Sequence, residues 1–370
     1  MIESQVALLG TCRKHSDPRP GAEGEGIIAP MARLHSPPQL ALRWRHSIDD
    51  HVIAVAWSPD GSTIAAASVA GPVTLFDVST GLTKHSLRGH GFGTTAVSWR
   101  ADGKKLATAG QDGKVRLWNV EDGQEIAALD GGTAWVEHIA WGPTGDFLVS
   151  AAGKKLRLWN PDGSLAKAYT DSLSTISAVG WSSRGKEFVA AGYGGVTFFR
   201  PDAPGPVNQF AWKSSILALA WSPDSNMLAG GCQDGSVHFW YVKSGEDLQM
   251  AGYPSKVKTL SWDPTSRYLA TGGGEIVVVW DCTGDGPAGS TPLSFELHTK
   301  PLSGVAFQHR GPLLASAAAD GKIALWHPGG SSKLQASADF AEGISQVAWS
   351  PGDGRLAVGG EQGKVAIYAV

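Results

Sequence analysis

The chain has 370 residues, a formal net charge of −3 and only three cysteines. The small net charge and the lack of a Lys/Arg run argue against binding to nucleic acid or to an anionic membrane surface. Cys12, Cys232 and Cys282 form no CxxC pair, so the sequence indicates neither a disulfide framework nor a zinc site. No window is apolar enough to span a membrane and the N-terminus does not resemble a signal peptide, so we expect a cytoplasmic protein.

The first 37 residues differ in character from the rest of the chain. They contain several prolines and a Gly/Glu run at residues 21–26, with little apolar periodicity. A segment of this kind cannot bury enough apolar surface to offset the entropy that it would lose on ordering. We therefore expect a disordered tail over residues 1–37 and a single folded domain over residues 38–370.

From residue 38 onward the sequence repeats. Each unit has an apolar strand ending in an aromatic residue (VIAVAW), a short strand of small residues (TIAAAS), a third strand ending in a second aromatic, and a more polar fourth strand. Successive first-strand aromatics are 42, 42, 40, 40, 41, 45 and 42 residues apart, which defines eight units: Trp57, Trp99, Trp141, Trp181, Trp221, Trp262, Phe307 and Trp349. Repeats of this length and composition predict an all-β, eight-bladed β-propeller of four-stranded antiparallel blades.

The eighth unit is incomplete, because Val370 follows its third strand directly. Residues 40–46 alternate between apolar and charged side chains and could supply the missing strand. We expect this N-terminal strand to complete the last blade and close the ring. The alternatives are an unpaired N-terminal strand or a ring of seven blades with a spare unit.

Residues 89–120 resemble one repeat of the WD40 family. They contain the Gly89-His90 pair, the turn Asp102-Gly103 and the ending Trp118-Asn119, where the family more often ends in Trp-Asp. The resemblance extends over nearly all of the repeating region. It implies a β-propeller without catalytic activity that serves as a scaffold, with no catalytic residues, metal ligands or cofactor.

The resemblance also implies a buried network of His, Ser/Thr, Asp and Trp inside a blade. Two units match this network at the same offsets of 18, 22 and 28 residues from the histidine: His90, Thr108, Asp112 and Trp118, and His298, Ser316, Asp320 and Trp326. A Ser/His/Asp set also invites a hydrolase interpretation. We favour a structural role, because the hydroxyl would lie on a buried strand and the tryptophan accounts for its partner. In the other units we expect aromatic packing in place of the network.

In WD40 propellers, the loop before the first strand and the turn between the second and third strands open on the usual partner face. We expect a protein or peptide partner to contact residues in these loops that the repeat does not dictate: Asp50, Phe92, Gln111, Trp135, Gln233, Lys256, Lys300 and Glu342. Phe92 and Trp135 are aromatics of the kind that dominate binding hot spots, although they could instead pack on neighbouring loops.

These features predict a monomeric propeller that works inside a larger complex, without contact to nucleic acid or membrane. One alternative is an eight-bladed quinone-cofactor dehydrogenase, which should carry cofactor-binding charges and a metal site at the axis. The other is a propeller that binds a small ligand or a sugar, which should place more polar groups at its mouth.

Overall fold

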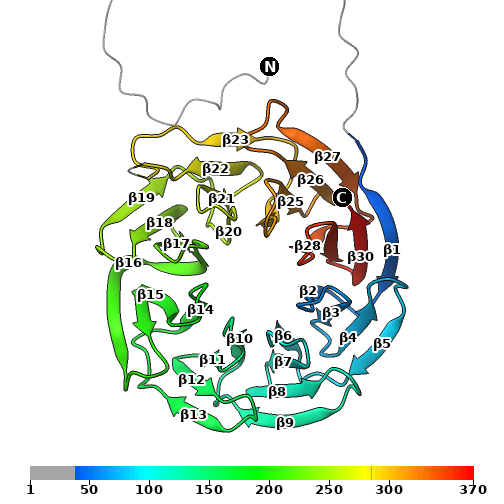
Figure 1. Cartoon of the computed structure of the whole chain (residues 1–370), viewed down its shortest axis with the longest axis vertical. Coiled ribbons are helices and arrows are strands. Elements are labelled where there is room, and N and C mark those ends of the chain that lie inside the picture. The colour runs from blue at the N-terminus through cyan, green and yellow to red at the C-terminus, as the bar shows by residue number, and fades with distance from the viewer. Residues whose placement is uncertain (1–37, 285) are drawn as a thin grey trace, which may run out of the picture.

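The computed structural model describes residues 38–284 and 286–370, so the disordered tail predicted over residues 1–37 lies outside the described range. Within that range every regular element is a β-strand, and the sheets surround a central opening (Figure 1). In the sheets made of four consecutive strands, the chain moves outward from a strand beside the opening to a strand at the rim.

The first three sheets in chain order each contain four consecutive strands. The first holds β2 (Val52–Trp57), β3 (Thr63–Ser68), β4 (Val73–Asp77) and β5 (Thr83–Leu87). The second holds β6 (Thr94–Trp99), β7 (Lys105–Gly110), β8 (Lys114–Asn119) and β9 (Glu125–Asp130). The third holds β10 (Val136–Trp141), β11 (Leu148–Ala152), β12 (Lys155–Trp159) and β13 (Leu165–Ala168).

The fourth sheet has six strands: β14 (Ile176–Trp181), β15 (Phe188–Phe199), β16 (Pro206–Trp221), β17 (Met227–Cys232), β18 (Ser236–Tyr241) and β19 (Asp247–Ala251). The fifth holds β20 (Thr259–Trp262), β21 (Tyr268–Gly272), β22 (Val277–Asp281) and β23 (Leu293–Phe295). The sixth holds β24 (Leu302–Phe307), β25 (Leu314–Ala318), β26 (Lys322–Trp326) and β27 (Leu334–Asp339). The seventh joins β28 (Ile344–Trp349), β29 (Arg355–Gly360) and β30 (Lys364–Ala369) to β1 (Ala41–Ser47).

The prediction of eight four-stranded blades is therefore wrong. The described residues form seven sheets, and the six-stranded sheet contains both the fourth and the fifth repeat units. These units merge because β16 pairs with β15 along its first half and with β17 along its second half, without a break between them. Counted by sheets, the propeller is seven-bladed, and one blade carries two repeat units.

Burial follows the position of each strand in its sheet. All six residues of β3 are buried, because their small side chains allow neighbouring sheets to approach from both sides. Most residues of the outer strand β5 are exposed and polar. The apolar core is accordingly divided into clusters that lie between adjacent sheets rather than in one central body.

The N-terminal strand closes the outer side of the ring. β1 pairs antiparallel with β30 from Ala41↔Ala369 to Ser47↔Lys364, as the alternating sequence suggested. The residues just before it also reach the preceding sheet, where Ser337 on β27 donates to Pro38 O and accepts from Leu40 N, both at 3.0 Å.

The inner side of the ring is closed independently of β1. Ser345 Oγ on β28 donates to Val52 O on β2 at 2.6 Å. Trp57 Nε1 donates to Ala348 O at 3.1 Å, which again joins the first sheet to the last.

The bond made by Trp57 recurs around the ring. The indole N–H of a first-strand tryptophan donates to the carbonyl of the residue before the aromatic in the preceding unit, in the pairs Trp99–Ala56, Trp181–Ala140, Trp221–Gly180, Trp262–Ala220 and Trp349–Ala306. Two units lack it. Phe307 has no indole, and Trp141 Nε1 is buried without a hydrogen-bond partner among the described residues.

A serine replaces the missing bond in both units. Ser98 Oγ accepts from the backbone N–H of Trp141 at 3.0 Å, and Ser261 Oγ accepts from that of Phe307 at 2.9 Å. Each serine stands immediately before the first-strand aromatic, where the other units have alanine or glycine. The two serines thus restore an inter-unit hydrogen bond where the indole bond is absent.

Replacing Ser98 with alanine should therefore lower the free energy of unfolding by about 1–3 kcal/mol, since it leaves a buried N–H without a partner. Equilibrium unfolding in urea measures this effect. Ser86→Ala on the exposed face of β5 is the matched control and should change stability by less than about 0.5 kcal/mol. Equal midpoints for the two variants would contradict the assignment.

Candidate partner-binding face

Two kinds of loop meet on one face of the ring. We call the loop before each inner strand the leading loop, and the turn between the second and third strands the middle turn. Main-chain hydrogen bonds join them within a unit, as from Gln111 N to Gly93 O at 3.0 Å. They also join neighbouring units, as from Ile176 N to Gly153 O at 2.8 Å. The loops are therefore held in place by backbone, and their side chains are free to point outward.

Phe92 and Trp135 both project from leading loops into solvent. Phe92 is 88% exposed and Trp135 is 54% exposed, so neither packs fully on the neighbouring loops. Phe92 also has a φ of 67°, a left-handed conformation that costs a non-glycine residue about 1–2 kcal/mol. Asp50, at the same position of the first unit, shares this conformation with a φ of 62°.

Three further exposed apolar residues, which the sequence did not single out, lie in or beside the same loops. Val69 is 39% exposed on a middle turn and Leu173 is 91% exposed on a leading loop. Tyr193 is 65% exposed within β15, at the position where other units have their middle turn. We call Val69, Phe92, Trp135, Leu173 and Tyr193 the apolar arc, because they follow one another over the first four repeat units. A signal was available in the sequence, since the position of Val69 and Tyr193 is held by Gln, Glu, Gly or Ala in the other units.

Contacts between the loops bring members of the apolar arc together in two places. A Cβ atom placed on Gly93 would lie 2.6 Å from Val69 O, which puts Phe92 beside the middle turn of the first unit. Ser174 Oγ donates to Tyr193 O at 2.9 Å and so fixes Leu173 next to this part of β15.

The polar residues predicted on this face have different environments. Asp50, Gln233, Lys256 and Lys300 are exposed, and Gln111 is half-buried. Asp50 accepts a hydrogen bond from His51 N at 2.7 Å. Neither Lys256 nor Lys300 forms an ion pair with any of the described residues.

Glu342 does not belong with the exposed residues, because it is only 8% exposed. Its Oε1 accepts from Gln362 N at 2.8 Å and from Lys364 N at 3.1 Å, and its Oε2 lies 3.2 Å from Lys364 Nζ. Asp112 and Asp320 cap the same turn position in their own units, by accepting from Lys114 N and Lys322 N. Glu342 is thus a structural cap that reaches the middle turn from the leading loop.

The two predicted networks are formed. His90 Nδ1 lies 2.9 Å from Asp112 Oδ1, His90 Nε2 lies 2.8 Å from Thr108 Oγ1, and Trp118 Nε1 donates to that hydroxyl at 2.9 Å. In the second network, His298 lies 3.4 Å from Asp320 and 2.8 Å from Ser316, whose hydroxyl accepts from Trp326 at 2.8 Å.

The electrostatics of the first network are those of a structural element. Burial lowers the pKa of His90, so the ring is neutral at pH 7 and donates from Nδ1 to the carboxylate. Burial alone would raise the pKa of Asp112, but hydrogen bonds led by that of His90 lower this pKa overall. Thr108 and Ser316 are completely buried, which keeps any reagent from their hydroxyls and argues against the hydrolase interpretation.

A third network occurs where only aromatic packing was expected. Tyr253 stands at the histidine position, and its hydroxyl lies 2.7 Å from Thr271 Oγ1 and accepts from Trp280 Nε1 at 2.8 Å. Burial raises the pKa of Tyr253 to about 12, so the phenol stays protonated. Thr271 follows Tyr253 by the same 18 residues that separate His90 from Thr108, and this offset could have revealed the network.

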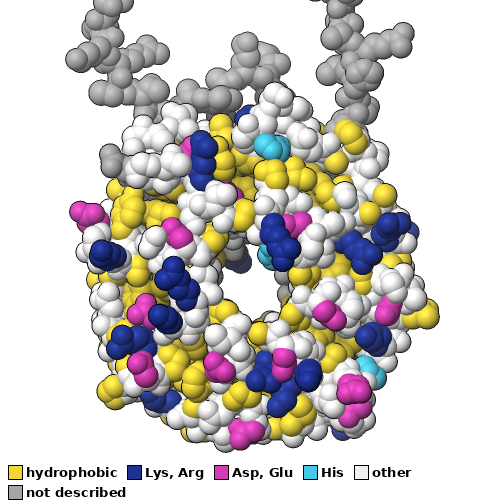
Figure 2. All heavy atoms as spheres, viewed as in Figure 1, with side chains coloured by type: hydrophobic (Ala, Val, Ile, Leu, Met, Phe, Trp, Pro, Cys, Tyr) yellow, Lys and Arg dark blue, Asp and Glu magenta, His cyan; other side chains and the backbone are white. Residues whose placement is uncertain are grey.

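Charge is mixed over the face of the ring that Figure 2 displays. Lys and Arg side chains alternate with Asp and Glu around the central hollow, without a basic patch.

Cys232 and Cys282 are buried free thiols. No helix in the part of the chain that the structure describes is long and apolar enough to cross a lipid bilayer.

A ring of antiparallel sheets that carry buried His–Ser/Thr–Asp–Trp networks defines a WD40 β-propeller. The chain belongs to this family: the family model "IFT122 first beta-propeller" matches residues 51–275, which is more than half of the 370 residues. A second model, "WD domain, G-beta repeat", matches residues 289–327. WD40 propellers are in general non-enzymatic scaffolds for protein interactions.

Curated relatives match shorter stretches. "Cell division cycle 20.6, cofactor of APC complex" from Arabidopsis thaliana is 25% identical over 202 residues, covering 50% of this chain and 46% of the relative. "WD repeat-containing protein slp1" from Schizosaccharomyces pombe is 25% identical over 162 residues, covering 41% and 33%. "Cilia- and flagella-associated protein 337 B" from Tetrahymena thermophila is 23% identical over 178 residues, covering 45% and 14%. The aligned region is thus less than half the length of each relative.

Among solved structures, the computationally designed Ika8 protein superposes with a TM-score of 0.76 at 21% sequence identity. The match covers 90% of this chain and all of the designed protein. At this identity the likeness supports the fold alone.

Proposed function

We propose that the protein is a non-catalytic scaffold that captures a protein or peptide partner on the face that carries the apolar arc. The main support for this proposal is Phe92, whose bulky side chain is 88% exposed and whose backbone is in a strained left-handed conformation. The exposure of this aromatic ring does not serve the packing of the repeat. Strained residues that the surrounding structure must maintain are concentrated at binding sites.

The arrangement around Phe92 supports the same proposal. Trp135, Leu173 and Tyr193 extend the apolar surface over adjacent units. Aromatic side chains that become buried when a partner binds supply most of the binding energy at protein interfaces. Lys256 and Lys300 lie on the opposite side of the same loop face and would favour carboxylates of the partner.

The names of the relatives agree with a role in a multiprotein assembly. Two Arabidopsis relatives are called cofactors of the APC complex. We propose that this chain likewise contributes a single propeller to a multiprotein complex. The buried free thiols of Cys232 and Cys282 support a reducing compartment, and we place the protein in the cytoplasm.

The double variant Phe92→Ala/Trp135→Ala should reduce partner capture from a native lysate by about thirtyfold or more, since truncating a hot-spot residue costs about 2 kcal/mol or more. Affinity capture followed by quantitative mass spectrometry measures the effect. The matched control is Ile126→Ala/Leu165→Ala, which removes exposed apolar side chains from the outer strands β9 and β13. Equal capture by both double variants, with unchanged circular dichroism, would exclude the apolar arc as the binding surface.

A further inference from the structure

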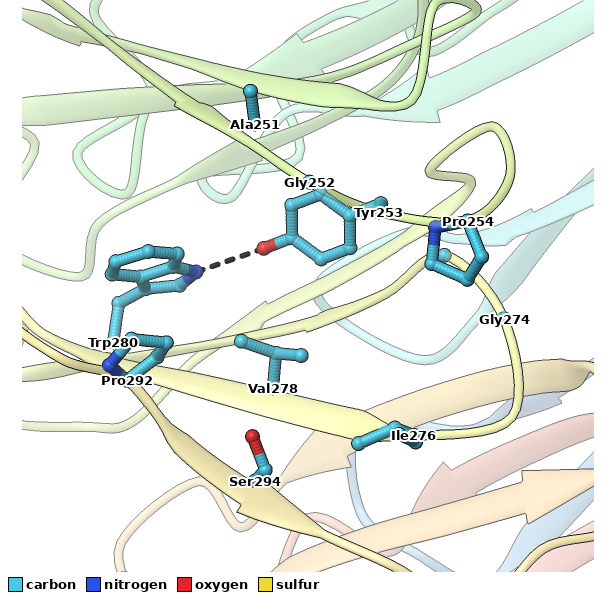
Figure 3. A pocket seen from close by; sticks show the side chains of 11 residues that line it. Ala251, Gly252, Tyr253, Pro254, Gly274, Ile276, Val278, Trp280, Pro292 and Ser294 are labelled. Carbon is cyan, nitrogen blue, oxygen red and sulfur yellow. Dashed lines mark hydrogen bonds between the residues drawn. The ribbon is translucent and has the colours of Figure 1, made fainter. Parts of the chain in front are cut away.

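An apolar cleft of about 140 Å³ lies where the outer end of β19 meets the sheet formed by β20–β23 (Figure 3). Tyr253 and Trp280, joined by their hydrogen bond, form one wall. Val278 and Ile276 on or just before β22 and Pro254 on the leading loop contribute the remaining apolar surface. The cleft is separate from the apolar arc, which spans the first four repeat units.

The side chain beside the cleft is much shorter than the one at the same position in the second and third units. Val278 stands two residues before the third-strand aromatic, where the second and third units have Arg116 and Arg157. Arg116 turns back over its own sheet and pairs with Asp112 and Glu125, and Arg157 donates to Asp130 O at 2.6 Å. Val278 has neither the length nor the charge to make such contacts.

The fifth and fourth units can be compared at the same third-strand position. In the fifth unit His238 occupies this position and is covered by Trp212, with the ring centroids 3.7 Å apart. In the fourth unit the position holds Thr197, and a larger cleft of about 340 Å³ opens between the corresponding loops. The cleft of the fourth unit thus also lies beside a short third-strand side chain.

Glycines keep the cleft of Figure 3 accessible. A Cβ atom added to Gly274 would lie 2.7 Å from Pro254 Cγ, and one added to Gly273 would lie 3.0 Å from Tyr253 Cβ. The leading loop can approach the middle turn so closely only because both positions lack a side chain. The close contact between the leading loop and the middle turn shapes the cleft, and no side chain from Gly273 or Gly274 fills it.

We infer that this cleft receives one isobutyl- or phenyl-sized side chain from an acidic segment of a protein partner. An apolar cavity of about 150 Å³ accommodates one benzene molecule, so the volume fits a single leucine or phenylalanine side chain. Lys256 follows the lining residue Pro254 by two positions, and Lys300 lies on the next leading loop, where Leu302 N donates to Gly274 O at 2.8 Å. Both lysines are exposed, as is Lys258 on the first of these loops. The acidic residues of the two loops and of the middle turn between them are Glu275 and Glu296, which leaves three lysines against two carboxylates. The excess of positive charge selects carboxylates beside the apolar side chain.

The inference rests on the proposed function in that it assumes a partner on the same loop face. The test uses the whole chain and a synthetic peptide, acetyl-Asp-Glu-Leu-Asp-Glu-amide. Binding is measured by the shift of the indole ¹H–¹⁵N resonance of Trp280. The peptide should shift this resonance in a saturable manner. A peptide with alanine in place of leucine should bind about tenfold more weakly, because the buried isobutyl group is lost.

Val278→Arg copies the residue found at this position in the second and third units and should weaken binding of the leucine peptide at least tenfold. Ile276→Ser, at a rim position that is 42% exposed, provides a second test if the arginine variant does not fold. Lys256→Ser/Lys300→Ser should weaken binding severalfold at low salt and less at high salt.

Equal binding of the leucine and alanine peptides, or no saturable shift of the Trp280 resonance, would overturn the inference. So would full binding by a folded Val278→Arg or Ile276→Ser variant. Phe92→Ala/Trp135→Ala should bind the peptide normally even though it loses partner capture. The failure of one proposal is thus distinguishable from the failure of the other.

Discussion

A chain that begins at Asp49 should melt about 5–10 °C below a chain that begins at Pro38. The two differ by the segment that contains β1, which pairs with β30 along its length. Leu40 is only 8% exposed in the core between the last two sheets. Trp44 packs on Phe76 with ring centroids 5.6 Å apart and donates to Val78 O at 2.9 Å. The segment therefore connects the last sheet to the sheets on both of its sides.

The size of the effect follows from these contacts. Burial of Leu40 and Trp44, together with the lost hydrogen bonds, corresponds to about 3–5 kcal/mol. The ring should not open completely, because Ser345 and Trp57 still join the first and last sheets at the inner strands. The exposed edge of β30 would, however, offer unpaired backbone groups to other chains.

Circular dichroism melting of both chains measures the loss, and light scattering detects the association expected of the exposed edge. The chain that begins at Pro38 is the control, because it lacks the preceding residues but retains β1. Identical melting temperatures for the two chains would show that β1 does not stabilise the ring.

Asp112→Ala should lower the free energy of unfolding by about 1–3 kcal/mol. The carboxylate accepts from His90 Nδ1, from Lys114 N and from Arg116 Nη2. Removal of the carboxylate leaves the buried imidazole of His90 without its acceptor. The imidazole then no longer holds the Thr108 hydroxyl in the orientation that accepts from Trp118. A complete network favours one register of the strands, so several sites lose stability together.

Urea unfolding measures this change, and Asp122→Ala is the matched control. Asp122 is an exposed turn residue that caps only Gln124 N, so its removal should cost less than about 1 kcal/mol. Asp320→Ala in the second network should behave like Asp112→Ala, because Asp320 accepts from Thr299 N and Lys322 N as well as from His298. If Asp112→Ala proved as stable as Asp122→Ala, the network would have no part in holding the sheet.

The resemblance to WD40 repeats, together with matching local spacing, was sufficient to predict the two histidine networks. The offsets from His90 to Thr108, Asp112 and Trp118 are those of a leading loop, a second strand, a middle turn and a third strand of one sheet. Residues that share a sheet through short turns are brought together by the repeat itself. Extending the offset to Tyr253 and Thr271 would have revealed the third network from the sequence.

The number of sheets could not be obtained in this way. Aromatic spacing counts repeat units, whereas a sheet is defined by which backbone groups bond to each other. β16 continues through residues 212–215, where the other units break into a leading loop, and this continuity merges the fourth and fifth units. Nothing in the identity of those residues requires the break or the continuation.

The composition of the binding face was likewise only partly predictable. Phe92 and Trp135 were identified because the repeat does not need them, but Glu342 looked equally exposed in the sequence. Its burial depends on the path of its side chain to Gln362 on the middle turn of the same unit and to Lys364 at the start of β30. Sequence position assigns a residue to a loop but does not determine which way its side chain turns.

By itself, the sequence of this protein determined the all-β repeat, the closing strand β1 and the two histidine networks, because each follows from periodicity and short-range spacing. Only the tertiary structure decided the merging of two units into one sheet, the exposure of the apolar arc and the cleft beside Val278. These three features arise from contacts between neighbouring units, where the approach of two backbones and the length of one side chain determine whether space is filled, paired or left open.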